Sequence, residues 1–214
     1  MHIPDGFLSA GVIAGCWVAS VAGVGYAARR ASGSLGEREV PLLPVMGAFI
    51  FAAQMLNFRV TGGTSGHLLG GALAAIVLGP WPATLVLSAV LLVQVLVFQD
   101  GGLLALGANV LNMAVVGVLV GYAVYAALRW PLGSGKVGLP VRAFLAAWVS
   151  VVTAALLTAV ELALSGAFSL GVALAAMGSV HALIGVGEGI ITALVVGFLR
   201  ATRPDLVRSA EAAA

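Results

Sequence analysis

Long apolar stretches alternate along the chain with short segments that hold most of the charged and turn-forming residues. Seven stretches can be counted: Phe7–Ala28, Val40–Phe58, His67–Gly79, Ala83–Gln99, Leu103–Leu128, Ala143–Ser165 and Leu170–Leu199. Most approach the ~20 apolar residues that one crossing of a bilayer needs. The third is short and stops at Pro80. The last exceeds one crossing and predicts either one long tilted helix or a helix broken near Gly185–Gly189.

Composition sets the class of protein. Of the 214 residues, 61% are hydrophobic and 8% are charged, whereas a soluble domain carries about 25% charged residues. This excludes a soluble enzyme, a nucleic-acid-binding protein and a disordered chain. A bilayer core accepts only helices or closed barrels, and these stretches are too long and too uniformly apolar for barrel strands. The sequence therefore predicts an all-α, polytopic helical bundle in the plasma (inner) membrane.

The basic residues predict how this bundle is oriented. If seven spans alternate and the N-terminus lies outside, nine of the ten Lys and Arg residues fall on the inner side, and Arg59 alone lies outside. This is the bias that the positive-inside rule describes. We expect a single transmembrane domain over residues 1–214, with an outer N-terminal segment at 1–6, the bundle at 7–199 and a cytoplasmic tail at 200–214.

The first residues do not have the form of a secretory signal. Residues 1–6 hold no Lys or Arg, and the apolar stretch that follows is long enough to span the membrane. We therefore expect the mature chain to begin at Met1. The single cysteine, Cys16, excludes a disulfide framework and a site built from several thiolates.

A histidine at position 2 creates a possible metal chelate. The Met1 amine and the His2 amide nitrogen close a five-membered ring around an ion, and the amide and the His2 Nδ1 close a six-membered ring. The amide must lose its proton, which Ni²⁺ or Cu²⁺ can enforce and Mg²⁺ or Ca²⁺ cannot. Three nitrogens then lie in one plane, and tetragonal nitrogen sites favour Ni(II) or Cu(II).

A fourth nitrogen is available from His67, which opens the third stretch at the same outer side. The chain before it, Gly62-Gly-Thr-Ser-Gly66, consists of small residues that allow a second backbone to come close. A metal-binding histidine needs a partner for its other ring nitrogen. The local candidates for that partner are Asn57, Thr61, Thr64 and Ser65. Each histidine taken alone is also compatible with an exposed or interfacial role.

Other polar residues lie inside apolar stretches, where ionisable groups are functional candidates. His181 and Glu188 are seven residues apart on one face of the last stretch, and Asn109 and Asn112 are one turn apart in the fifth. They either hold helices together or line a substrate pocket. Ala48 and Ala52, four residues apart, form a smooth face that suits helix packing or the docking of another membrane subunit.

Motifs for catalysis and nucleotide binding are absent. Gly133-Ser-Gly-Lys136 lacks the spacing of a phosphate-binding loop and is followed by Val137 instead of Ser or Thr. We therefore expect no ATP site in this chain. No Ser/His/Asp or HExxH arrangement supports an intramembrane hydrolase, so the chain is not expected to be an enzyme.

Several of these segments resemble the CbiM/NikM family, whose members are the substrate-binding S components of energy-coupling-factor transporters for cobalt and nickel. The similar segments are Met1-His-Ile-Pro-Asp-Gly-Phe7, Gln54-Met-Leu-Asn57, Gly62-Gly-Thr-Ser-Gly-His-Leu-Leu-Gly-Gly71, Asp100-Gly-Gly102, Leu106-Gly-Ala-Asn-Val-Leu-Asn112 and His181-Ala-Leu-Ile-Gly-Val-Gly-Glu188. The resemblance covers nearly the whole chain. It departs from the family at Phe58-Arg-Val-Thr61, where a Pro-containing, uncharged stretch is expected.

The resemblance implies a seven-helix fold with an extra N-terminal helix and Ni²⁺ or Co²⁺ as the transported substrate. It implies a metal site formed by the Met1 amine, the amide and ring of His2, and His67. It also implies partners: a transmembrane coupling (T) component, two cytoplasmic ATPases and often a small accessory membrane subunit. Ala48 and Ala52 are the candidate docking positions by this resemblance.

Two other functions compete with this one. A self-sufficient secondary nickel/cobalt permease would need ligands or a proton relay along its spans; the HxxxxDH-type motif of such carriers is absent, although His181 and Glu188 leave an opening. A non-transporting subunit that senses the metal is the other alternative. The sequence does not separate nickel from cobalt.

Overall fold

The computed structural model describes residues 1–33, 35–36, 40–60 and 64–207, and for 58–60, 64 and 65 it describes the backbone alone. The elements in chain order are α1 (Ala10–Ala31), α2 (Leu42–Gln54), β1 (Phe58–Val60), β2 (Thr64–Gly66), α3 (Gly71–Leu78), α4 (Pro80–Val97), α5 (Leu106–Asn109), η1 (Val110–Gly117), α6 (Val118–Ala127), α7 (Arg129–Leu132), α8 (Gly138–Leu164) and α9 (Leu170–Thr202). The segment η1 is π-helical, and α5, η1 and α6 follow one another without a gap.

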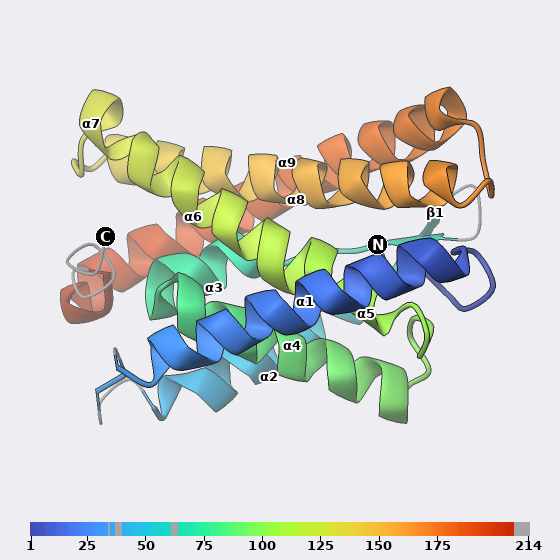
Figure 1. Ribbon diagram of the computed structural model, residues 1–214. Helices are drawn as coiled ribbons and strands as arrows, with labels where there is room; N and C mark the ends of the chain where they lie inside the picture. Colours follow the sequence, from blue (N-terminus) through green and yellow to red (C-terminus); the bar gives the residue numbers. More distant parts are fainter. Residues whose placement is uncertain (34, 37–39, 61–63, 208–214) are drawn as a thin grey trace.

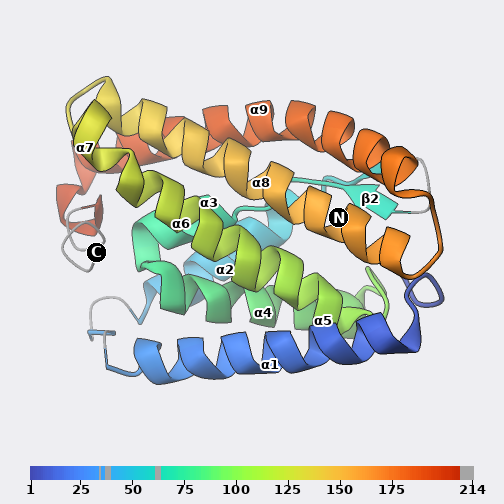
Figure 2. The ribbon, with the colours of Figure 1, turned by 45° about the horizontal axis from the view of Figure 1, so that its top comes forward.

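The long helices run lengthwise beside one another and form a bundle (Figures 1 and 2). Five helical stretches of the described chain are long and apolar enough to cross a membrane, namely α1, α4, α5 to α6, α8 and α9. The apolar helices α2 and α3 are shorter, with 13 and 8 residues. The prediction of an α-helical, multi-pass membrane protein is confirmed.

Two predicted spans differ from the helices that form. The stretch expected to run from Val40 to Phe58 is helical only to Gln54, and β1 then pairs antiparallel with β2. The stretch expected to begin at His67 becomes helical only at Gly71. The turn into α3 occurs at Gly70, which has φ +76°, and a Cβ there would lie 2.9 Å from Ile50 Cγ1. A residue with a side chain would resist this conformation.

The last apolar stretch is one helix, α9, and does not break at its glycines. A Cβ on Gly189 would lie 2.6 Å from Phe144 of α8, and one on Gly185 would lie 3.0 Å from Trp148. These glycines therefore serve the close approach of α9 to α8, as small residues do between membrane helices.

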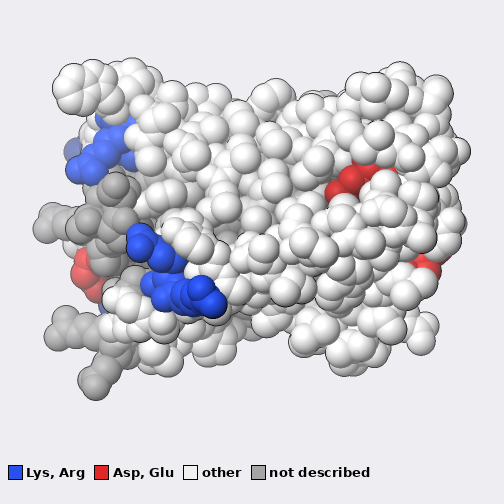
Figure 3. Space-filling model, in the orientation of Figure 1, with Lys and Arg blue, Asp and Glu red and all other residues white. Residues whose placement is uncertain are grey.

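The two ends of the bundle differ in charge. On the face shown in Figure 3, Lys and Arg side chains gather at the end where Figure 1 places α7 and the C-terminus. The last turn of α1 carries Arg29 and Arg30, and the last turn of α9 carries Arg200. The opposite end carries the β1–β2 hairpin and the start of α1 (Figure 1). The N-terminal residue lies toward that second end (Figures 1 and 2) and is buried.

Candidate metal centre

The N-terminal segment is fixed inside the bundle by the side chain of Asn109 in α5. Asn109 Oδ1 accepts a hydrogen bond from the Ile3 N–H at 2.8 Å, and Asn109 Nδ2 donates to the Ile3 carbonyl at 3.1 Å. The Gly102 N–H also donates to that carbonyl, at 2.9 Å. Ile3 is fully buried. Both polar groups of its peptide backbone therefore have partners, as burial requires.

Asp5 secures the segment a second time. Its carboxylate accepts hydrogen bonds from the backbone N–H groups of Leu103, Leu104 and Ala105, at 2.9 to 3.1 Å. These groups precede α5, so the carboxylate also lies where the helix dipole favours negative charge. Gly102 makes this approach possible, because a Cβ there would lie 2.4 Å from the Asp5 backbone nitrogen.

The His2 ring begins a chain of hydrogen bonds whose direction can be deduced. Gln54 Nε2 donates to the Leu69 carbonyl at 2.7 Å, and Gln94 Nε2 donates to Gln54 Oε1 at 2.9 Å. Gln94 Oε1 then faces His2 Nε2 at 3.0 Å. A carbonyl can only accept, so each amide in the chain is oriented by the Leu69 carbonyl at its end. His2 Nε2 therefore carries the proton, and Nδ1 keeps its lone pair.

His2 Nδ1 is buried and has no hydrogen-bond partner. It lies 3.4 Å from Asp100 Oδ1, which is longer than an N–H···O hydrogen bond. Asp100 thus contacts this ring through its carboxylate, and it forms a hydrogen bond with the Asn57 side chain. The lone pair of Nδ1 is thus available to bind a cation.

His67 presents its other nitrogen, Nε2. Its Nδ1 donates to the Leu68 carbonyl at 2.8 Å, so Nε2 carries the lone pair, and Nε2 is buried without a partner. The His2 and His67 ring centroids lie 4.6 Å apart, with the planes tilted by 31°. The fold therefore brings together the rings of His2 and His67, which are far apart in the sequence and each have one unprotonated nitrogen.

The Met1 amine belongs to the same buried cluster. Met1 is 1% exposed, and the amine is close enough to the rings of both His2 and His67 that its protonated form would interact with them electrostatically. Burial lowers the pKa of the amine to about 4 and that of the His2 ring to about 3. At neutral pH these nitrogens are uncharged, so that they can bind a cation without first losing a proton.

A metal ion at this position would need donors besides the two histidine rings. In the part of the chain that the structure describes, no three His, Cys, Asp or Glu side chains are grouped so that they could hold an ion. The Met1 amine and the His2 amide directly precede the His2 side chain in the covalent chain. Together with the two rings they could supply four nitrogens, a donor set that suits Ni(II) or Cu(II) and not Mg²⁺ or Ca²⁺.

The expected partners of His67 are not the ones observed. The Leu68 carbonyl accepts the hydrogen bond from Nδ1, whereas the Asn57 side chain bonds to Asp100. Thr61 lies outside the described residues, as do the side chains of Thr64 and Ser65.

The remaining polar candidates separate into three groups. Asn109 holds the N-terminal segment, as described above. Asn112 donates to Glu161 Oε2 at 2.7 Å and to Thr158 Oγ1 at 3.1 Å, which joins η1 to α8. Glu188 accepts from the backbone of the segment that follows His67.

His181 is not paired with Glu188, although both lie on α9. Its Nδ1 donates to the Met177 carbonyl at 2.8 Å, and its buried Nε2 has no partner. The His181 ring interacts electrostatically with the Met1 amine and with His67. It is therefore a neighbour of the cluster.

Sequence reasoning missed the role of Gln54 and Gln94. Both side chains are fully buried. The available signal was a single amide within an apolar run, as in Leu91-Leu-Val-Gln-Val-Leu-Val97, because polar groups in membrane spans are expensive unless they have partners.

Comparison of this chain with known proteins finds relatives that are all named as metal transport or uptake proteins. The family model of CbiM, described as a cobalt uptake substrate-specific transmembrane region, matches residues 2–206. A protein of Haloquadratum walsbyi named as a metal transport protein is 46% identical over 209 residues, covering 97% of this chain and 93% of that protein. A protein of Archaeoglobus fulgidus named as a fused nickel transport protein, NikMN, is 44% identical over 97% of this chain and 68% of its own length. The crystal structure of a truncated transition metal transporter superposes with a TM-score of 0.88, at 36% identity, over 94% of this chain and 99% of that chain.

Proposed function

This chain belongs to the CbiM family of cobalt uptake transmembrane proteins, and from that membership we propose that it captures Ni²⁺ or Co²⁺ as the S component of an ATP-driven energy-coupling-factor transporter. The family consists of multi-pass membrane transport proteins and not of enzymes. The ion is the cargo, and the ATP is hydrolysed by other chains.

The proposed ligands are the Met1 amine, the His2 amide nitrogen, His2 Nδ1 and His67 Nε2. The observation that carries this set is the pair of buried, unpartnered ring nitrogens. In each histidine the nitrogen needed for the chelate is the one left free, because the other nitrogen donates to Gln94 or to Leu68. Since the tautomers are fixed before an ion arrives, little reorganisation is needed on binding.

The path of the ion follows from the orientation that we propose. The end of the bundle that carries the basic residues (Figure 3) faces the cytoplasm, in keeping with the positive-inside rule. The end with the β1–β2 hairpin then faces outward, and the ion enters there. In this arrangement the two short helices α2 and α3 accompany the five long helical stretches, which gives seven helical segments in the described chain apart from the four-residue α7.

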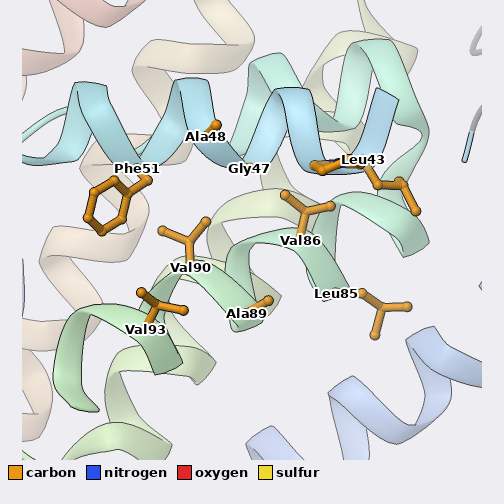
Figure 4. A pocket seen from close by; sticks show the side chains of 10 residues that line it. Leu43, Gly47, Ala48, Phe51, Leu85, Val86, Ala89, Val90 and Val93 are labelled. Atoms are coloured by element: carbon orange, nitrogen blue, oxygen red, sulfur yellow. The ribbon is translucent and has the colours of Figure 1, made fainter. Parts of the chain in front are cut away.

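The docking surface for the coupling component is the groove between α2 and α4 (Figure 4). It has a volume of about 440 Å³, and its lining residues are all apolar or glycine. Ala48 of α2 lines it and is exposed, and Ala52 is exposed one turn further on. Small residues here would let a helix of the coupling component approach α2 closely.

The ligand set can be tested on the purified protein. Nickel bound by four planar nitrogens should give a yellow, diamagnetic species, and binding should be lost when the Met1 amine is acetylated. The control is the same protein with a free Met1 amine. Retention of the spectrum after acetylation would exclude the amine as a ligand. Uptake of radioactive nickel by cells with and without the ATPases separates an ATP-driven S component from a self-sufficient permease and from a sensor subunit.

A further inference from the structure

The backbone of Leu69 is held from two sides by side chains of two different helices. Gln54 of α2 donates to its carbonyl at 2.7 Å. Glu188 of α9 accepts from its N–H with one carboxylate oxygen. The other oxygen accepts from the Gly70 N–H at 2.8 Å. Leu69 is fully buried, and Glu188 is 2% exposed. This stretch of backbone therefore has a defined position relative to both helices.

Glu188 fulfils a need that the sequence of the loop creates. The positive φ of Gly70 turns the chain into α3, and the N–H groups at the start of a helix lack partners within it. Within a membrane, no water replaces those partners. The carboxylate gains two charge-assisted hydrogen bonds in return, which a buried carboxylate requires.

His67 depends on the same stretch of backbone. It is two residues before Leu69, and its ring bonds to the Leu68 carbonyl, within its own loop. The ring therefore moves with residues 67–70. A displacement of this backbone by about 1 Å would move Nε2 out of the plane of the other three nitrogens, since binding groups have to be held within about 0.5 Å.

We propose that Glu188 is a positioning residue for the metal: its two hydrogen bonds to the backbone after His67 set the place of the fourth ligand and connect that ligand to helix α9. This rests on the ligand set proposed above. A movement of α9 relative to α2 would shift Glu188 relative to Gln54, and with them the backbone of Leu69, and would displace His67 from the ion.

Two substitutions separate position from charge. Glu188→Gln keeps the shape of the side chain but replaces one acceptor oxygen by a donor, which opposes a backbone N–H. Glu188→Asp keeps the negative charge but is shorter by one methylene group. If Glu188 positions the loop, both variants should bind nickel about 10- to 100-fold more weakly. If its charge alone attracts the cation, Glu188→Asp should bind like the unmodified chain, which would overturn the proposal.

The matched control is Glu161→Gln. Glu161 is also a buried carboxylate in a long helix, but it bonds to Asn112 and Cys16 and not to the His67 loop. We expect this variant to keep the nickel affinity and the spectrum of the unmodified chain. A loss equal to that of Glu188→Gln would show that any buried carboxylate has the same effect, and the proposal would fail.

A double-mutant cycle identifies the route by which Glu188 acts. If it acts through His67, then His67→Ala and His67→Ala/Glu188→Gln should bind nickel with the same affinity, within about twofold. The visible spectrum of Glu188→Gln should also shift toward that of His67→Ala. A full additional loss of affinity in the double variant would mean that Glu188 acts independently of His67.

Hydrogen exchange in the metal-free protein tests the hydrogen bonds between Glu188 and the backbone independently of nickel binding. The amides of Leu69 and Gly70 should be protected in the unmodified chain and exchange faster in both Glu188 variants, while the midpoint of α8 remains protected. If these amides exchange equally in all three proteins, the positioning role is refuted. If they respond as expected but the unmodified chain binds no nickel, then the proposed function fails and the loop anchor stands.

Discussion

Substituting Asn109 by alanine tests whether the docked N-terminal segment controls metal binding. The substitution removes the acceptor of the Ile3 N–H and one of the two donors to the Ile3 carbonyl. A buried N–H without a partner costs about 2 kcal/mol, and the second hydrogen bond contributes about 1 kcal/mol because Gly102 still donates to the same carbonyl. The docked position should therefore lose about 3 kcal/mol relative to an undocked one.

This loss of stability of the docked segment sets an upper limit on the decrease in nickel affinity. Each 1.4 kcal/mol corresponds to a factor of ten, so the equilibrium between docked and undocked segments shifts by roughly 100-fold. An undocked amine does not contribute to the site, and nickel affinity falls by at most this factor, according to how far the undocked form becomes populated. The measurement is competitive nickel titration, together with the rate at which an aminopeptidase removes Met1.

Asn112→Ala is the control for this prediction. Asn112 lies one turn further along and is equally buried, but it bonds to Thr158 and Glu161. It should leave the aminopeptidase rate unchanged. If Asn109→Ala keeps both the nickel affinity and the protease resistance of the unmodified chain, the N-terminal segment is not held by Asn109 and the reasoning is refuted.

Two further predictions concern protons and docking. Burial lowers the pKa of the Met1 amine to about 4 and that of His2 to about 3, so both are already neutral at pH 7, and nickel should release about one proton there, from the His2 amide. Calorimetry in buffers of different ionisation enthalpy counts the protons released on nickel binding. Nickel affinity should fall about tenfold for each unit of decreasing pH, and more steeply below about pH 4. Release of two protons at pH 7 would contradict a neutral amine. Ala48→Trp should fill the groove between α2 and α4 and abolish ATP-driven uptake while nickel binding by the isolated chain persists; unimpaired uptake would place the coupling component elsewhere.

Hydrophobic pattern was sufficient for the fold class and for most helix positions. Every apolar stretch contains a helix, and the long runs near Ala83–Gln99 and Ala143–Ser165 lie within three to five residues of α4 and α8. It failed at the ends of α2 and α3, where the chain leaves the helix although its residues stay apolar. At the start of α3, side chains from two other helices are involved: Gln54 of α2 and Glu188 of α9 satisfy the backbone of Leu69 and stabilise the non-helical segment before α3.

The proposed ligand residues could be named from the sequence because the chelate chemistry is local. The amine, amide and imidazole of residues 1 and 2 close chelate rings whatever the fold. The partners were not accessible, since Gln94 lies 92 residues from His2 and Asn109 lies 106 residues from Ile3. Apolar periodicity shows that such an amide is buried but does not show which group it faces.

The tautomer of His2 shows why these distant partners matter. An isolated imidazole carries its proton on either nitrogen, and the chelate requires that it be on Nε2. The carbonyl of Leu69 can only accept, so it orients Gln54, which orients Gln94, which holds the proton on Nε2. Leu69 is also the residue whose N–H donates to Glu188 and which, in our proposal, places His67. The backbone at Leu69 thus orients the free nitrogen of the first histidine and, by the same proposal, positions the second, so that a movement of this backbone would disturb both proposed ring ligands together.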